Sequence, residues 1–99
     1  MALITPVCLA VNAWDSTQAH TFYFNATGGD QVVKNRITIR NNSTNVVVYQ
    51  NTVTSFLFEQ TVPANTLTNG TYYNVYFNTY DVSNNISANS NIVQFYCYS

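Results

Sequence analysis

The stretch "LTNGTYYNVYFNTYD", from Leu67 to Asp81, carries the clearest fold signal in the chain. From Tyr73 onward, Tyr, Val, Phe and Thr occupy the odd positions, while only Asn and Tyr occupy the even ones. A period of two is typical of a β-strand whose two faces meet different surroundings. Gly70, just before this alternation, marks a turn. The stretch therefore predicts a turn followed by a strand.

The same period of two recurs along the chain, and no window follows the 3.6-residue period of a helix. Besides the opening stretch, the predicted strands are 7–13, "HTFYFNA" (20–26), "NRITIR" (35–40), "VVVYQ" (46–50), "SFLFEQTV" (55–62) and "NIVQFYCY" (91–98). Pairs of residues expected to share one face are Phe22 and Phe24, Ile37 and Ile39, and Phe56 and Phe58. Seven short strands separated by turn signals predict an all-β fold, a seven-stranded antiparallel β-sandwich.

Length and composition set the outer limits. The 99 residues fit a single domain, with a core expected over about 6–96. Charged residues make up 7% of the chain, so Asn, Thr and Ser supply most of its polarity. A net charge of -1 with three Lys or Arg residues argues against nucleic acid as a partner. No apolar run approaches the ~18 residues of a membrane span, so we expect no membrane insertion.

The two cysteines, Cys8 and Cys97, lie almost at the two ends of the sequence. A disulfide between them would close a loop of nearly the whole domain. In a sandwich, however, the start of the first strand and the end of the last one lie far apart, whereas a disulfide needs a short Cα separation. The sequence favours two free thiols and leaves the disulfide as the alternative.

Leu67, Gly70 and Tyr73 follow the spacing L-x-x-G-x-x-Y. This spacing resembles the tyrosine corner of immunoglobulin-like and fibronectin type III domains. The resemblance implies that the Tyr73 hydroxyl bonds back to the backbone of the turn, that Gly70 permits the turn and that Leu67 closes the end of the core. Tyr72 should then face outward. The alternative is an ordinary hairpin turn before a strand.

The resemblance to fibronectin type III domains extends over most of the chain. "TPVCLAVNA" is similar to the first strand of that family, and "NNISANSNIVQF" is similar to its last loop and strand, with Ser87 and Ser90 as a serine pair. Two features depart from the family pattern. Phe22 or Phe24 stands where a tryptophan is usual, and the absence of an Arg-Gly-Asp tripeptide leaves integrin adhesion without support.

The Asn- and Thr-rich segments "VVKNRITIRNNSTNVVVYQ" and "TVPANTLTNGTYYNVYFNTYD" resemble fibronectin-like modules in tail and receptor-binding proteins of tailed bacteriophages and prophages. This resemblance implies a non-catalytic structural or spacer module of a tail fibre or baseplate protein. Such a module is a virion component, made in the bacterial host cytoplasm. Its implied partners are other virion subunits or neighbouring domains, and host cell-wall glycan if it contributes to attachment.

The sequence ends just past the last predicted strand, which indicates the first domain of a longer protein that starts at Met1. The alternative function is a carbohydrate-binding or adhesion module of a bacterial surface protein or a polysaccharide-degrading enzyme.

The sequence predicts no enzyme. His20 is the single histidine, and we expect it near the surface at the start of a strand. General acid–base catalysis needs two groups within reach of one reacting centre, and no spacing suggests such a pair. The acidic residues, which fall in different turns or strand ends, are Asp15, Asp30, Glu59 and Asp81. We therefore expect no catalytic residue, no cofactor and no metal site.

If the domain binds a ligand, aromatic and amide side chains are the available groups. Tyr76, Asn78 and Tyr80 share the outward face of the strand in the opening stretch. Three roles remain open for this face: a site for sugar rings, plain strand surface, or a contact with another domain or subunit. We expect Trp14 to cap the end of the core rather than to recognise a ligand.

Overall fold

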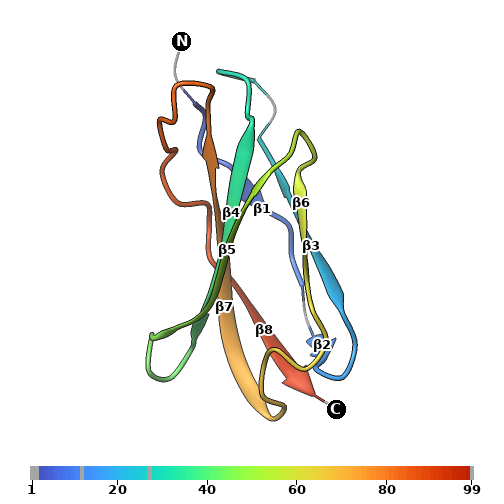
Figure 1. Cartoon of the computed structure of the whole chain (residues 1–99). Helices are drawn as coiled ribbons and strands as arrows, with labels where there is room; N and C mark the ends of the chain where they lie inside the picture. Colours follow the sequence, from blue (N-terminus) through green and yellow to red (C-terminus); the bar gives the residue numbers. More distant parts are fainter. Residues whose placement is uncertain (1–2, 12, 27, 99) are drawn as a thin grey trace.

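The computed structural model describes residues 3–11, 13–26 and 28–98, and these form two β-sheets packed face to face (Figure 1). One sheet has the order β1-β3-β6, and the other has the order β2-β8-β7-β4-β5. The strands are β1 (Val7–Cys8), β2 (Ala13–Asp15), β3 (His20–Asn25), β4 (Lys34–Asn41), β5 (Val47–Thr54), β6 (Glu59–Val62), β7 (Thr71–Tyr80) and β8 (Val93–Tyr98). The predicted all-β sandwich is confirmed. None of the described segments forms a helix long and apolar enough to span a membrane.

The first predicted strand, 7–13, is two strands in the structure. β1 pairs antiparallel with β3 in the three-stranded sheet, whereas β2 pairs parallel with β8 in the other sheet. Asn12, which the prediction included, lies outside the described residues. Cys8 in β1 and Trp14 in β2 are both buried and lie at positions of the same parity, so the period of two did not reveal the crossover. The described residues thus form eight strands, and one pair of them is parallel.

The prediction of a strand over 55–62 is wrong in its first half. β6 begins only at Glu59, and the preceding residues form a bend. Phe56 is 71% exposed, whereas Phe58 is half-buried and lies 5.3 Å from Phe24 between ring centroids. The reason is topological, since the chain leaves β5 in one sheet here and crosses to β6 in the other.

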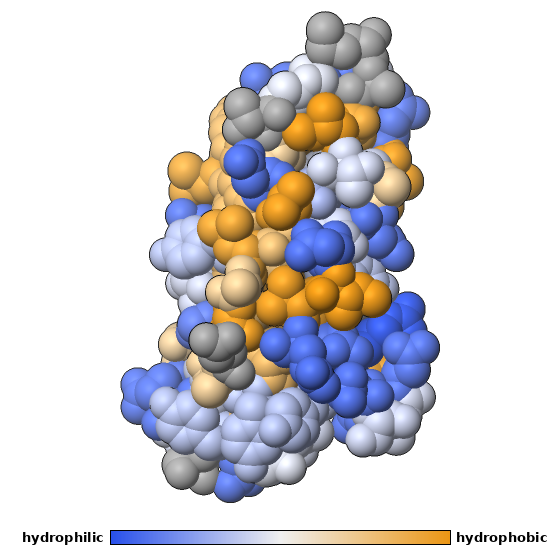
Figure 2. Space-filling view, turned by 180° about the vertical axis from the view of Figure 1, so that it is seen from behind, coloured by the Kyte–Doolittle hydropathy of each residue, from blue (hydrophilic) through white to orange (hydrophobic). Residues whose placement is uncertain are grey.

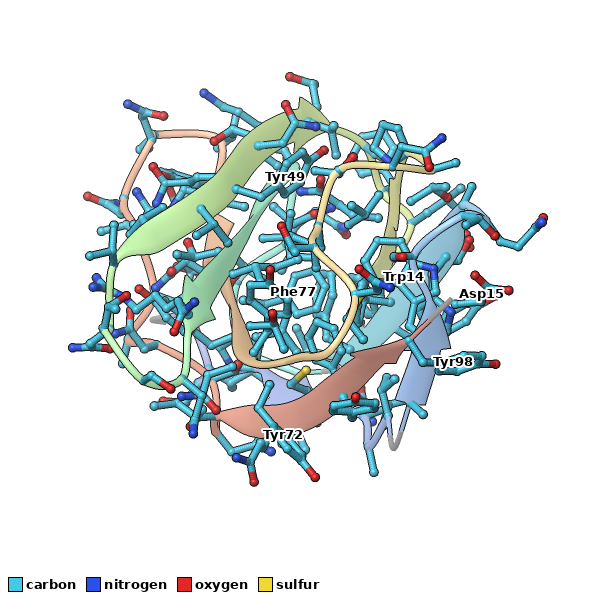
Figure 3. All side chains as sticks on the ribbon, turned by 90° about the horizontal axis from the view of Figure 1, so that it is seen from below. Trp14, Asp15, Tyr49, Tyr72, Phe77 and Tyr98 are labelled. Atoms are coloured by element: carbon cyan, nitrogen blue, oxygen red, sulfur yellow. The ribbon has the colours of Figure 1, made fainter. Side chains whose placement is uncertain are left out.

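The core lies between the sheets and is built from the inward positions of the strands. Phe22, Phe24, Ile37 and Ile39 are all buried, as predicted. Seen from below, Phe77 lies between the two sheets (Figure 3), and its ring centroid is 4.5 Å from that of Phe24. Each fully buried side chain of this size contributes about 1.5–3 kcal/mol through removal of apolar surface from water.

Three amide side chains bridge the sheets where the chain crosses from β5 to β6. The Gln60 Nε2 group donates to Asn35 Oδ1 at 2.8 Å and to the Asn51 carbonyl at 2.9 Å. Asn51 Nδ2 donates in return to Gln60 Oε1 at 3.3 Å. Buried amides are tolerated when they are hydrogen-bonded in this way. The bridge therefore fixes the crossing that the strand pattern did not predict.

The loop between β7 and β8 runs beside β7 and is bonded to it. The hydroxyl of Ser90 accepts a hydrogen bond from the Phe77 amide at 2.8 Å, and that of Ser87 accepts from the Thr79 amide at 2.9 Å. The backbone amides of both serines also donate to the carbonyls of the same two residues. The serine pair noted in the sequence therefore bonds to the backbone of β7 beyond the residues that pair with β8.

Cys8 and Cys97 are both free and buried, as the sequence favoured. Burial raises the pKa of the Cys8 thiol to about 11. Burial, and to a smaller extent the charge of Asp15, also raise the pKa of Cys97. Both thiols therefore stay protonated near neutral pH.

Candidate functional site

The turn from Leu67 to Tyr73 has the geometry that the sequence predicts. The Tyr73 hydroxyl accepts a hydrogen bond from the Thr68 amide at 3.0 Å and makes a longer contact of 3.5 Å with the Thr68 carbonyl. Gly70 has a φ of 75°, a conformation that side chains oppose. Leu67 and Tyr73 are buried, whereas Tyr72 is 53% exposed. This part of the opening stretch serves the fold.

The even positions of β7 share one surface with the outward positions of β4. We call this surface of the five-stranded sheet the outer face. Arg36 lies opposite Asn78, Thr38 lies opposite Tyr76, and Lys34 lies opposite Tyr80. The predicted set Tyr76, Asn78 and Tyr80 is therefore brought together on the outer face.

The predicted set does not form an open binding surface. Tyr76 is 7% exposed, Asn78 is 1% exposed and Tyr80 is half-buried. Asn78 Nδ2 donates to the Ser87 carbonyl at 3.3 Å and to Asn89 Oδ1 at 2.7 Å, both in the loop between β7 and β8. The expectation that the outward Tyr and Asn residues are accessible needs correction, because this loop covers part of the outer face.

Three cations lie on the outer face and were not predicted as site residues. Lys34 Nζ donates to Asn84 Oδ1 at 2.8 Å and lies 5.6 Å from the centre of the Tyr80 ring. Arg36 Nη2 donates to Asn78 Oδ1 at 3.2 Å. The signal was present in the sequence, because Lys34, Arg36 and Arg40 occupy positions of the same parity in one strand.

Arg40 completes this row at the hairpin end of β4. Its Nε group donates to the Tyr76 hydroxyl at 3.2 Å, and Nη1 donates to the Asn45 carbonyl at 2.9 Å. Its guanidinium carbon also lies 5.9 Å from the centre of the Tyr76 ring, a distance at which cation–π attraction operates. Within the described ranges, the polar partners of all three cations are uncharged groups.

Tyrosines on β7 and β8 extend the outer face beyond the cations. Tyr72 and Tyr96 lie opposite each other, and their ring centroids are 4.8 Å apart. Tyr72 and Tyr98 point away from the core (Figure 3), and they are 53% and 46% exposed. Both tyrosines offer ring surface to a partner, in contrast to the covered Tyr76.

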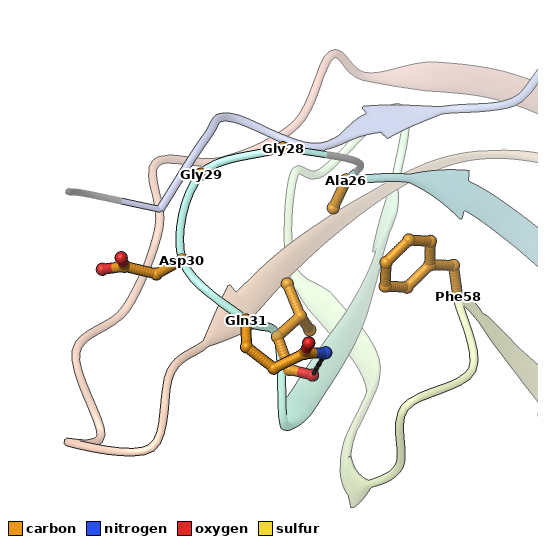
Figure 4. A pocket seen from close by; sticks show the side chains of 7 residues that line it. Ala26, Gly28, Gly29, Asp30, Gln31 and Phe58 are labelled. Atoms are coloured by element: carbon orange, nitrogen blue, oxygen red, sulfur yellow. Dashed lines mark hydrogen bonds between the residues drawn. The ribbon is translucent and has the colours of Figure 1, made fainter.

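Two shallow hollows lie near the loop between β3 and β4. The larger, of about 380 Å³, is lined by this loop and Phe58, and Asp30 points away from Phe58 (Figure 4). The smaller, of about 280 Å³, has Asp30 and Asp81 in its wall. Hydrogen bonds from the side chain and amide of Asn85 hold the pKa of Asp81 below its usual range. Asp81 is therefore a turn-stabilising carboxylate rather than a free acid or base.

His20 and Trp14 lie side by side and pack against the core. His20 is half-buried at the start of β3, with its ring centroid 4.7 Å from that of Phe22, and burial lowers its pKa. Trp14 is 3% exposed, and its Nε1 group donates to the Gln18 carbonyl at 2.8 Å. Within the described residues, no three His, Cys, Asp or Glu side chains gather as a metal site would require.

The back of the molecule carries a band of apolar side chains, with hydrophilic residues beside and below it (Figure 2). Exposed apolar residues of the chain include Val7, Leu9 and Ile92, at 54%, 48% and 64% exposure. The segment around Val7 and Leu9 is tied to the segment around Ile92 by Asn91, whose side chain bonds to both the amide and the carbonyl of Cys8.

No protein-family model and no curated protein matches the sequence. Among solved structures, the fold is similar to that of a myokine, with 11% identity and a TM-score of 0.72 over 99% of this chain and 97% of that one. It is also similar to part of a β-1,2-glucanase from Parabacteroides distasonis, with 17% identity and a TM-score of 0.69, covering 99% of this chain and 13% of that one. A pectate lyase from Pectobacterium carotovorum shows 14% identity and a TM-score of 0.63, with 92% and 27% covered. Likeness at this level of identity concerns the fold alone.

Proposed function

We propose that this chain is a non-catalytic structural module that joins neighbouring subunits or domains, in a tail fibre or baseplate protein of a bacteriophage virion. The virion setting and the fibronectin type III classification rest on the sequence resemblances of segments 32–50 and 61–81 and of the turn at Tyr73. The observation that carries the joining role is the exposed edge formed by the start of β5.

Three consecutive valines are exposed at this edge. Val46, Val47 and Val48 are 58%, 39% and 43% exposed, and the last two belong to β5. Among the strands of the described residues, β5 has β4 as its single neighbour, so the backbone along its other side is open to a further strand. The Asn51 carbonyl already accepts a hydrogen bond from the Gln60 side chain. The part of the β5 backbone that is free to pair with another strand is therefore the half that begins with the valines.

Natural edge strands are usually protected against pairing by charged residues or proline. The segment from Asn41 to Phe58 contains neither. A second copy of this chain is the partner we infer, because a two-fold axis brings the same patch of both copies together. A net charge of -1 also leaves little repulsion between copies.

Light scattering over a concentration series tests the joining role. We expect the wild-type chain to associate at micromolar to millimolar concentration and Val48→Lys to weaken association at least tenfold. Val82→Lys is the matched control, because Val82 is 86% exposed in the turn after β7, away from the edge. A wild-type chain that stays monomeric throughout, or equal losses in the two variants, would overturn the proposal.

The virion setting has a separate test. Mass spectrometry of phage particles from the bacterial strain that carries the gene should detect peptides of this chain in purified tails. Their absence from particles in which other tail proteins are detected would contradict it.

A carbohydrate-binding module of a surface protein or polysaccharide-degrading enzyme is the second candidate. It is favoured by the tyrosines exposed on the outer face and by the recurrence of the fold within proteins described as a glucanase and a pectate lyase. Retention of the chain on bacterial cell walls, and its loss in a Tyr72→Ala variant, would support this role.

A further inference from the structure

We infer that the outer face binds an acidic polysaccharide, a linear sugar polymer that carries carboxylate or sulfate groups. This inference goes beyond the joining role, because it uses the outer face rather than the edge of β5. Its first basis is that all Lys and Arg residues of the chain, three in number, lie on this one face of β4. The rest of the chain therefore carries the whole negative charge.

The spacing of the cations suits an extended polymer. Residues on the same face of a strand recur every two positions, which corresponds to about 7 Å. Lys34 and Arg36 are thus about 7 Å apart along β4, and Arg36 and Arg40 are about 14 Å apart. A row of this length matches successive charged groups of a linear chain better than one compact anion.

Among the residues that the structure describes, the three cations have no charged partner on the outer face. Arg36 is half-buried, and its Nε atom is buried without any hydrogen-bond acceptor. A cation that is partly removed from water without a counter-ion is destabilised. An anionic group placed above Arg36 would compensate this charge.

Asp15, Asp30 and Glu59 lie away from this row, whereas Asp81 lies in the same turn as Asn84, to which Lys34 bonds. Glu59 belongs to the opposite sheet, and Asp30 lies in the loop between β3 and β4. The oxygens of Asp81 accept hydrogen bonds from the residues that follow it in the turn. Asp15 lies on β2, which β8 and β7 separate from β4 by about 14 Å, three strand spacings. An anion that approaches Arg36 and Arg40 therefore meets positive charge.

The tyrosines beside the cations favour a sugar polymer over a nucleic acid. Tyr72 lies two residues from Asn74, which faces Arg40 across the sheet, and its ring packs with that of Tyr96. Aromatic rings pack against the apolar faces of sugar rings, and amides such as Asn74 bond to hydroxyl groups. A nucleic acid carries a phosphate at every residue and usually selects a strongly basic domain, whereas the pI is about 5.4.

Affinity electrophoresis with four polymers tests the inference. Polygalacturonate and dextran sulfate are the acidic probes, neutral dextran is the uncharged control, and poly(dT) represents nucleic acid. We expect at least one acidic polysaccharide to bind, with a slope of log affinity against log salt of about −2 for three charge contacts. Binding to polygalacturonate alone would identify carboxylate as the anionic group, and binding to dextran sulfate alone would identify sulfate. Absence of binding to both, equal binding of neutral dextran, or tighter binding of poly(dT) would overturn it.

Matched variants locate the site. Lys34→Gln should weaken binding about fivefold to tenfold and reduce the salt slope by about one. Thr52→Glu, in register with Arg36, should weaken binding, whereas Thr61→Glu, at the exposed position of β6 in the opposite sheet, should not. Tyr72→Ala should weaken it more than Tyr23→Ala, because Tyr23 is 49% exposed on the opposite sheet. Melting curves confirm that each variant folds, and equal effects within either pair would contradict the assigned face.

Discussion

The two faces of β7 are both buried along much of the strand, but by different means. On the inner face, Val75 and Phe77 are fully buried by apolar contacts with the opposite sheet. On the outer face, Asn78 is almost as buried, yet hydrogen bonds from Arg36 and to the loop between β7 and β8 surround it. Burial of one strand thus has two sources, apolar packing and hydrogen bonding, and apolar alternation in the sequence predicts only the first.

Phe77→Ala is expected to have the largest effect. It should lower the free energy of unfolding by about 3–5 kcal/mol, because the change leaves a cavity beside Phe24 in the core. Urea denaturation followed by fluorescence measures the loss. Tyr80→Ala, on the half-buried outer face, should cost clearly less. Similar losses would show that the outer face contributes as much apolar packing as the core.

Asn78→Ala tests the polar burial of the outer face. We expect a loss of about 1–3 kcal/mol in the same measurement, because Arg36 loses its acceptor and Asn89 loses its donor. Asn74→Ala is the matched control, since its amide bonds to Asn42 in an exposed position. If the two variants lose equal stability, the loop does not cover Asn78 in solution.

Tyr73→Phe removes the hydroxyl that bonds to Thr68 and should cost on the order of 1 kcal/mol. Tyr72→Phe should cost far less, because Tyr72 is 53% exposed on the other face. Thermal melting of the two variants side by side compares the faces at adjacent positions. Equal losses would mean that the register of β7 is wrong.

The smallest effect near neutral pH concerns Cys8, which also faces the core. Its pKa is raised from 9.0 to about 11, so the folded state keeps its proton where the unfolded state loses it. This contribution to stability is complete below pH 9 and is lost as the pH rises toward 11. Cys8→Ala should therefore flatten the decline of stability with pH in this interval. An unchanged decline would contradict the buried thiol.

The fold was predictable because most of its determinants are local. The period of two located β3, β4 and β7, and the spacing of Leu67, Gly70 and Tyr73 predicted the turn. Crossovers between the sheets left no such signal. The bend at 55–58 contains Phe56 and Phe58 in strand-like alternation, although only Phe58 packs against the core.

The candidate site was less predictable than the fold, for a physical reason. Whether an outward residue meets solvent depends on loops that return from elsewhere in the chain. Asn78 was predicted on the correct face but is covered through Ser87 and Asn89. The cation row was readable from the positions of Lys34 and Arg36, yet its lack of charged partners became evident only from the arrangement of the other strands.

The parallel pairing of β2 with β8 has a mechanical consequence. The chain enters at one end of a sandwich 43 Å long, and β8 finishes at the other end (Figure 1). A force that pulls the two ends apart would load the hydrogen bonds between Ala13–Asp15 and Tyr96–Tyr98 in shear. Bonds loaded in shear resist together, whereas bonds at a peeling edge break in succession. The short β2 strand therefore acts as a clamp that lets the module bear tension along its length.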